Sequence, residues 1–129
     1  MATEYMELRV SPEQAEGLAE FIDFRWGRRS EALGDGIGSD TARLMSEMAA
    51  LLALHDELLA VKEGDAVVSA PRHLLREMLE DGAGYARESI GWALSGEYGS
   101  GEKAQARIRG GKGLMELAHR EGLYEGVMV

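Results

Sequence analysis

The chain has 129 residues, a formal net charge of −9 at pH 7 and no cysteine. Its length is typical of one domain with its own apolar core, and the absence of cysteine excludes disulfides, thiolate metal ligands and a cysteine nucleophile. The negative charge disfavours nucleic acid as a partner, because a negative field repels phosphate groups.

No stretch of the chain has the pattern of a membrane segment. The first residues lack the basic stretch and apolar run of a secretory signal. The longest unbroken apolar run, 48–54, has seven residues, whereas a helix that spans a bilayer needs about 20. We therefore expect a cytoplasmic protein that makes no contact with a membrane.

The chain opens with a pattern typical of a strand followed by a helix. Residues 6–10 alternate between apolar and charged side chains, which predicts a short half-buried strand. Ser11 and Pro12 are typical of an N-cap and a first helical position, and the helix that they open is predicted to reach Arg29 or Leu33. A glycine-rich loop is expected at 34–38. The predicted inward side chains of this helix are Ala15, Leu18, Ala19, Ile22 and Trp26.

The longest predicted helix runs from Ser39 to Glu63. Its apolar residues recur at steps of three and four, which places them on one face of a helix. They are Leu44, Met45, Met48, Leu51, Leu52, His55, Leu58 and Leu59. Ser39 is a good N-cap, and Gly64 favours the end of the helix. Because so apolar a face must be covered by neighbours, we expect this to be the core helix around which the other helices pack.

A second strand and a third helix are predicted after this segment. The β-branched residues of 66–69 favour a short strand, and Pro71 again favours the start of a helix. Gly82 and Gly84 interrupt the apolar pattern of that helix, and each glycine costs about 1 kcal/mol of helix stability relative to alanine. We therefore predict a kink or a break at 81–84.

The last predicted helix follows a loop at 96–101. Ser100 is expected to cap it and Gly122 to end it, although its own glycines weaken the helical pattern. Its predicted inward side chains are Ala104, Ile108, Gly111, Met115 and Ala118. The apolar residues 123–129 are expected to dock on the protein or on a dimer partner.

Together these elements predict a mainly α protein. We expect one domain over 1–129, with four helices arranged like a four-helix bundle around residues 42–61. The strands at 6–10 and 66–69 are expected to pair beside the bundle, which makes an α+β description possible.

His55, Glu116 and His119 are the candidate metal ligands. Glu116 and His119 stand three positions apart on the last predicted helix, which is the spacing of helical carboxylate–histidine metal sites. Such a di-metal site needs a second Glu-x-x-His, and the chain has none. We favour a core histidine bonded to a neighbour for His55. A divalent metal is therefore the alternative, and no cofactor is the primary expectation.

Four cations crowd the last predicted helix and form a candidate anion site. They are Lys103, Arg107, Arg109 and Lys112. Residues 99–129 hold four acidic and five basic side chains, whereas the rest of the chain is strongly acidic. The backbone N–H groups of the glycines at 110–113 are uncovered and could approach a phosphate. The interpretation that we favour is that these cations are solvated, or that they pair with the acidic first helix or across a dimer.

Other motifs carry less information. Residues 25–29 combine three arginines with Trp26, whose ring could stack on a base but also continues the inward face of its helix. Gly96 and Gly101 have the spacing of a phosphate-binding loop, but Glu102 displaces Lys103 by one position, and the residue that follows this lysine is Ala104, which has no hydroxyl. We therefore reject an NTPase.

The absence of a catalytic constellation makes a non-enzymatic interaction or regulatory module the leading hypothesis. We expect it to be a homo-oligomer, such as a homodimer, or to bind another protein. The apolar C-terminus supports this hypothesis, as do the small residues Gly82, Ala86, Ser89 and Ala93. The alternative is a binding protein for a metal or a small anionic ligand within the helical bundle. A nucleic-acid-binding protein is disfavoured by the charge.

Overall fold

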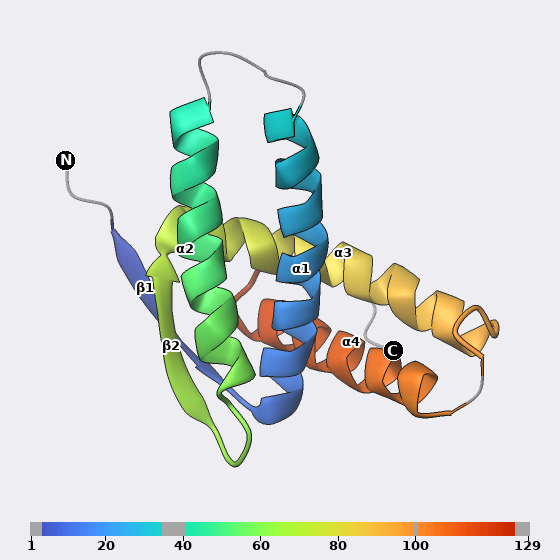
Figure 1. Cartoon of the computed structure of the whole chain (residues 1–129). Helices are drawn as coiled ribbons and strands as arrows, with labels where there is room; N and C mark the ends of the chain where they lie inside the picture. The colour runs from blue at the N-terminus through green and yellow to red at the C-terminus, as the bar shows by residue number, and fades with distance from the viewer. Residues whose placement is uncertain (1–3, 35–40, 100, 126–129) are drawn as a thin grey trace.

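The computed structural model describes residues 4–34, 41–99 and 101–125, apart from the side chains of residues 28–34 and 41. The described residues form four helices and one two-stranded antiparallel sheet, so the prediction of a mainly α protein with a strand pair is confirmed (Figure 1). The elements are β1 (Tyr5–Val10), α1 (Pro12–Gly34), α2 (Thr41–Leu59), β2 (Ala66–Pro71), α3 (Arg72–Leu94) and α4 (Glu102–Arg120).

The two predicted strands pair along their whole length. Their register places Leu8 opposite Val68, and both side chains are buried on the face that meets the helices. Tyr5 and Val67 are exposed on the other face. This difference follows from the period-2 alternation, because successive side chains of a strand point to opposite faces.

The start of α1 is held as the sequence predicts, and by one more contact. Ser11 Oγ accepts a hydrogen bond from the backbone N–H of Gln14 at 3.2 Å, and Gln14 Oε1 accepts one from the N–H of Ser11 at 3.0 Å. This reciprocal pair is a capping box, which satisfies two N–H groups at the start of the helix. The helix continues to Gly34, next to Leu33, the further of its two predicted ends. Most of the predicted loop at 34–38 lies outside the described residues.

The core is centred where α1, α3 and α4 meet, and it extends to the inner face of the sheet and to Leu51, Leu54 and Leu58 of α2. In Figure 1, α3 and α4 form an antiparallel pair that crosses α1. Phe21 of α1 is fully buried there, together with Met78 of α3 and Leu114 of α4. The interface between α3 and α4 and the one between α1 and α4 are the most extensive in the molecule.

The glycines of α4 allow this close packing. A Cβ atom on Gly17 of α1 would lie 1.9 Å from the carbonyl oxygen of Gly110, and a Cβ on Gly113 would lie 2.7 Å from the backbone of Glu13. The backbones of α1 and α4 therefore touch, which only residues without a side chain permit. Gly110 and Gly113 weaken the helical pattern of the sequence, and the structure shows that they form the contact of α4 with α1. Ser100, the predicted cap, lies outside the described residues, and Gly101 precedes the helix.

The predicted break at 81–84 is wrong, whereas the kink that was its alternative stays a prediction. The structure has a single uninterrupted helix from Arg72 to Leu94. Gly82 is buried, and a Cβ there would lie 3.0 Å from Leu114 and 3.1 Å from Phe21. The helix persists because packing against α1 and α4 compensates the low helix propensity of glycine.

The central role predicted for α2 also needs correction. This helix packs mainly against α1 and β2, at the side of the core that α1, α3 and α4 form. It is described from Thr41 to Leu59 and so ends before the predicted Glu63, while the predicted cap Ser39 lies outside the described residues. Its buried apolar residues include Met48, Leu51 and Leu58. The other part of the predicted inward face remains exposed.

The last described residues of the chain pack against the core. Leu123 and Tyr124 are partly buried against the core cluster, which agrees with the expected docking of the apolar tail. Residues 126–129 lie outside the described part of the chain.

Candidate functional site

The structure does not bring the three predicted metal ligands together. His55 lies on the inner side of α2, and its Nε2 is 3.0 Å from Oδ1 of Asp23, although the two groups are not aligned as a hydrogen bond. Glu116 and His119 are exposed on α4. Among the described residues, no group of three or more histidine, aspartate or glutamate side chains is arranged to hold a metal ion. His55 instead faces a carboxylate of α1.

Two of the four predicted anion ligands pair with α1. Arg107 forms an ion pair with Glu20, and its Cζ lies 5.0 Å from the centre of the Tyr98 ring. Arg109 donates a hydrogen bond of 3.1 Å to Glu16, and this bond raises the pKa of the guanidinium. Arg107 and Arg109 therefore pair with the acidic first helix, which is one form of the interpretation that the sequence favoured.

The other two cations have no carboxylate partner within the described part of the chain. Lys103 Nζ lies 5.8 Å from the centre of the Tyr98 ring, and Lys112 is exposed on α4. Two exposed lysines on a helix surface are solvated charges and define no site by themselves.

The basic cluster of residues 25–29 is only partly described. Arg25 forms an ion pair with Asp81 and lies 4.0 Å from Glu77, and its Cζ is 5.4 Å from the centre of the Phe21 ring. Trp26 is half-buried, and the side chains of Arg28 and Arg29 are not described. Arg25 therefore links α1 to α3.

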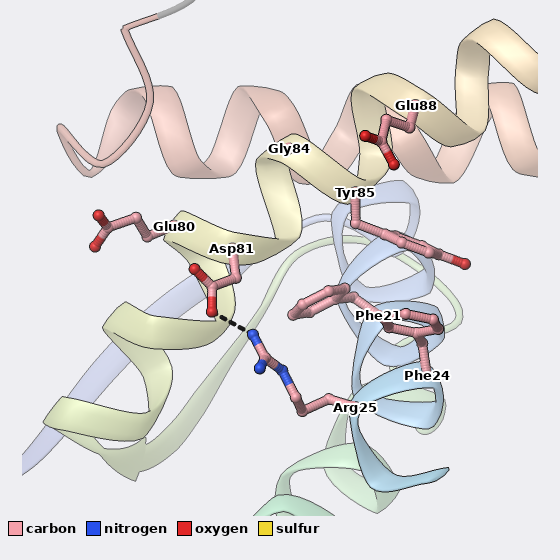
Figure 2. A pocket seen from close by; sticks show the side chains of 8 residues that line it. All are labelled: Phe21, Phe24, Arg25, Glu80, Asp81, Gly84, Tyr85 and Glu88. Atoms are coloured by element: carbon pink, nitrogen blue, oxygen red, sulfur yellow. Dashed lines mark hydrogen bonds and ion pairs between the residues drawn. The ribbon is translucent and has the colours of Figure 1, made fainter. Parts of the chain in front are cut away.

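A hollow of about 620 Å³ opens between α1 and α3, and Figure 2 shows it from close by. The rings of Phe24 and Tyr85 stack with their centres 4.8 Å apart, and Tyr85 lies 5.3 Å from the buried ring of Phe21. Burial raises the pKa of Tyr85, because a phenolate is poorly solvated there. The full lining is Phe21, Phe24, Arg25, Glu80, Asp81, Gly84, Tyr85 and Glu88.

The chemistry of this hollow is that of a binding surface. Its eight lining residues include three aromatic rings, three carboxylates and one guanidinium, and no histidine, serine or lysine. Such a set offers ring faces and charges to a ligand, but it lacks a nucleophile paired with a base. No local pattern in the sequence indicates this hollow, because its residues come from two helices that lie far apart along the chain.

A second surface lies on α2. Six exposed residues follow one another at alternating steps of three and four, and we call this row the α2 seam. The α2 seam consists of Ala42, Met45, Ala49, Leu52, Asp56 and Leu59. The side chains of Met45, Leu52 and Leu59 are 59%, 48% and 50% exposed. The large apolar residues Met45, Leu52 and Leu59 alternate along the row with the smaller residues Ala42, Ala49 and Asp56.

The α2 seam lies beside the buried face of the same helix. The large apolar residues of α2, from Leu54 at one edge to Met45 at the other, spread over roughly 180° of its circumference at 100° per residue, which exceeds the stripe of about 100° that packing in a domain needs. One part of this width contacts α1 and β2, and the other part remains at the surface. The sequence contains the necessary signal, because the width of the stripe can be counted from it.

A comparison with known protein families, with curated proteins and with solved structures finds no match to this chain. None of the described helices is long and apolar enough to cross a bilayer. The proposals below are based on two surfaces, the α2 seam and the hollow between α1 and α3.

Proposed function

We propose that the chain is a non-enzymatic interaction module that works as a homo-oligomer, and that the α2 seam is its binding surface. The observation that carries the proposal is the half-exposed state of Met45, Leu52 and Leu59 in one row. Burial of such side chains against another protein is favourable by about 25 cal/mol for each Å² removed from water. Aligned exposed apolar side chains of this kind mark interaction sites.

The spacing of the α2 seam suits another helix as the partner. Steps of three and four residues are the a and d positions of a heptad, which keep one row of side chains facing a second helix. The alanines at 42 and 49 leave room for the large side chains of a partner, and Met45 and Leu52 supply such side chains. The row is therefore complementary to itself, as a two-fold symmetric dimer requires.

Charge favours an antiparallel pair of α2 helices. A parallel pair would place Asp56 against Asp56 of the partner subunit, and like charges in the same layer destabilise a coiled coil. In an antiparallel pair with Ala49 level with the partner's Leu52, the two Asp56 residues would stand about 16 Å apart along the axis. Opposed helix dipoles also favour this direction.

The test is a charge placed in the α2 seam. We expect Leu52→Glu to weaken self-association at least tenfold, or by about 1.4 kcal/mol, because a carboxylate would be buried in the interface. Leu94→Glu is the matched control, since Leu94 is 70% exposed near the end of α3 and lies outside the seam. Sedimentation velocity over a range of concentrations measures both, and circular dichroism checks their fold.

The wild-type chain should be a dimer at high concentration, the L94E variant should match it, and L52E should be a monomer. A wild-type chain that stays monomeric up to its solubility limit would contradict the proposal of a homo-oligomer. Equal weakening by both variants would place the interface elsewhere.

Single cysteines test the direction of the pair, because the chain has no cysteine of its own. Ala49→Cys stands close to the proposed two-fold axis and should form a disulfide between two copies under mild oxidation. Ala42→Cys should form none, since two such residues would be about 25 Å apart in the antiparallel pair. Efficient cross-linking of Ala42→Cys would indicate a parallel pair.

A further inference from the structure

The hollow between α1 and α3 combines three aromatic rings with two carboxylates that have no partner among the described residues, and we propose that it binds a small organic cation with a flat apolar part. Aryl amidinium and guanidinium groups have this chemistry. The site is separate from the α2 seam, so the inference does not rest on the proposed function.

The rings supply a surface for a flat ligand. Phe24 is 42% exposed, and its ring stacks on Tyr85 with an angle of 27° between the two planes. Figure 2 shows the rings of Phe21, Phe24 and Tyr85 gathered on one side of the hollow. An aromatic group gains contact area on such rings, and a cation is attracted by the negative potential of their faces.

The carboxylates supply the charge preference. Glu80 and Glu88 stand at opposite ends of the lining, each one turn of α3 from Gly84, and Glu88 lies next to Tyr85 in Figure 2. Neither forms a hydrogen bond or an ion pair within the described part of the chain. The third carboxylate, that of Asp81, is already paired with Arg25. Two uncompensated negative charges therefore remain at the hollow, and they favour a cation over an anion.

Arg25 shows the geometry that such a cation would adopt. Its guanidinium lies 5.4 Å from the centre of the Phe21 ring and pairs with Asp81 at the same time. A ligand would repeat this arrangement further along α3, with Tyr85 as the ring and Glu88, about two turns beyond Asp81, as the carboxylate. The hollow thus already holds one cation between a ring and a carboxylate.

Gly84 keeps the space above α3 open. A Cβ atom at this position would meet nothing within 4 Å, so the wall of the hollow between Glu80 and Glu88 is bare backbone. A larger side chain here would start from open space and extend into the hollow, which makes Gly84→Leu a variant that blocks the site. Leucine is also a better helix former than glycine.

The probe is benzamidine, added to the full chain labelled with ¹⁵N and followed by NMR. We expect shifts centred on the backbone amides of Phe24, Gly84 and Tyr85, with millimolar affinity, because the hollow is shallow and open. Benzamide has nearly the same shape without the charge, and it should bind about tenfold more weakly. Benzoate should not bind.

Three variants distinguish binding in the hollow from a general electrostatic attraction of the cation to an acidic protein. Glu88→Gln should weaken benzamidine about threefold, which is the size expected for one exposed ion pair. Glu97→Gln removes the same charge from an exposed turn after α3, outside the lining, and should leave the affinity unchanged. Gly84→Leu should abolish the shifts, with circular dichroism as the check on its fold.

Several results would overturn the inference. Equal binding of benzamidine and benzamide would mean apolar adhesion without a charge preference. Equal weakening by Glu88→Gln and Glu97→Gln would mean unspecific attraction to the net charge. Benzamidine shifts that lie outside α1 and α3, or that are missing up to the solubility of the probe, would place no cation site in this hollow.

Discussion

Gly17 and Gly110 set the distance between α1 and α4, because neither has a side chain at their point of contact. The Cβ of an alanine at position 17 would overlap the carbonyl oxygen of Gly110 at 1.9 Å, and backbone cannot move aside as a flexible side chain can. Gly27 lies on the same helix, and a Cβ there would meet nothing within 4 Å. The two glycines of α1 therefore predict opposite effects of the same substitution.

We expect Gly17→Ala to lower the free energy of unfolding by about 3 kcal/mol, because α4 would have to shift away from α1. Gly27→Ala should raise it by up to about 1 kcal/mol through helix propensity alone. Urea unfolding followed by circular dichroism measures both. A tolerated Gly17→Ala would mean that the two backbones are further apart than described.

Tyr85 gives the fold a pH dependence at alkaline pH. Burial raises its pKa, with Tyr98 as a smaller cause, so the folded state prefers the protonated phenol. The stabilisation from this preference is complete below the usual tyrosine pKa of about 10 and is lost as the pH rises through the raised pKa. We expect the free energy of unfolding to fall less steeply above pH 10 in Tyr85→Phe than in the wild-type chain.

Urea unfolding at a series of pH values between 8 and about 11 measures this difference. Tyr5→Phe is the control, because Tyr5 is exposed on the sheet and should leave the pH dependence unchanged. Identical slopes for wild-type and Tyr85→Phe would show that Tyr85 titrates alike in the folded and unfolded chain.

At the scale of single elements, α3 shows how tertiary contacts override a local signal. The sequence 81–84 contains two glycines and predicts an interruption, yet the helix runs through it. Gly82 faces Phe21 and Leu114, and Gly84 faces open space. The two glycines that look equivalent in the sequence therefore have different surroundings.

We expect Gly84→Ala to raise the free energy of unfolding by up to about 1 kcal/mol, because alanine favours the helix and meets no neighbour. Gly82→Ala should instead lower it by about 1 kcal/mol, since the new Cβ crowds Phe21 and Leu114. Thermal unfolding of both variants distinguishes them. A Gly84→Ala variant with unchanged stability and lower helix content would support the interrupted helix.

The buried and exposed sides of α2 also show a difference that the local sequence pattern does not predict. The apolar residues of this helix were predicted to face one core, but Met45, Leu52 and Leu59 stand outside it. Periodicity identifies the apolar face of a helix correctly and cannot tell which part of that face the same chain covers. A stripe wider than one neighbour can cover is the signal that points to a second partner.

For the whole molecule, the proposed dimer should be weak. Met45, Leu52 and Leu59 of each copy are the half-exposed apolar side chains that the dimer would bury. Their burial must offset an association cost of at least about 4 kcal/mol, and both copies are acidic. We therefore expect the melting temperature to rise with protein concentration and with salt, since dimerisation stabilises the folded chain and salt screens the repulsion.

Differential scanning fluorimetry over a hundredfold range of concentration checks this prediction. Leu52→Glu should remove the dependence on concentration, whereas Leu94→Glu should retain it. A melting temperature of the wild-type chain that does not change with concentration would argue against dimerisation of the folded state.

The sequence by itself determined the elements and their order. The strands at 6–10 and 66–69, the start of α1 at Ser11 and Pro12, and the existence of four helices all follow from local chemistry. Period-2 alternation, a capping side chain and proline act within a few residues, so the chain carries these signals without help from distant segments.

Only the tertiary structure decided which parts of those elements are covered. The ion pair of Arg107 with Glu20, the contact of Gly17 with Gly110 and the exposure of Leu52 join or separate residues that are distant along the chain. Whether a surface is buried depends on which segment packs on it, and that segment is distant from the surface along the chain. The α2 seam and the hollow between α1 and α3 therefore came from the fold, although every residue in them was visible in the sequence.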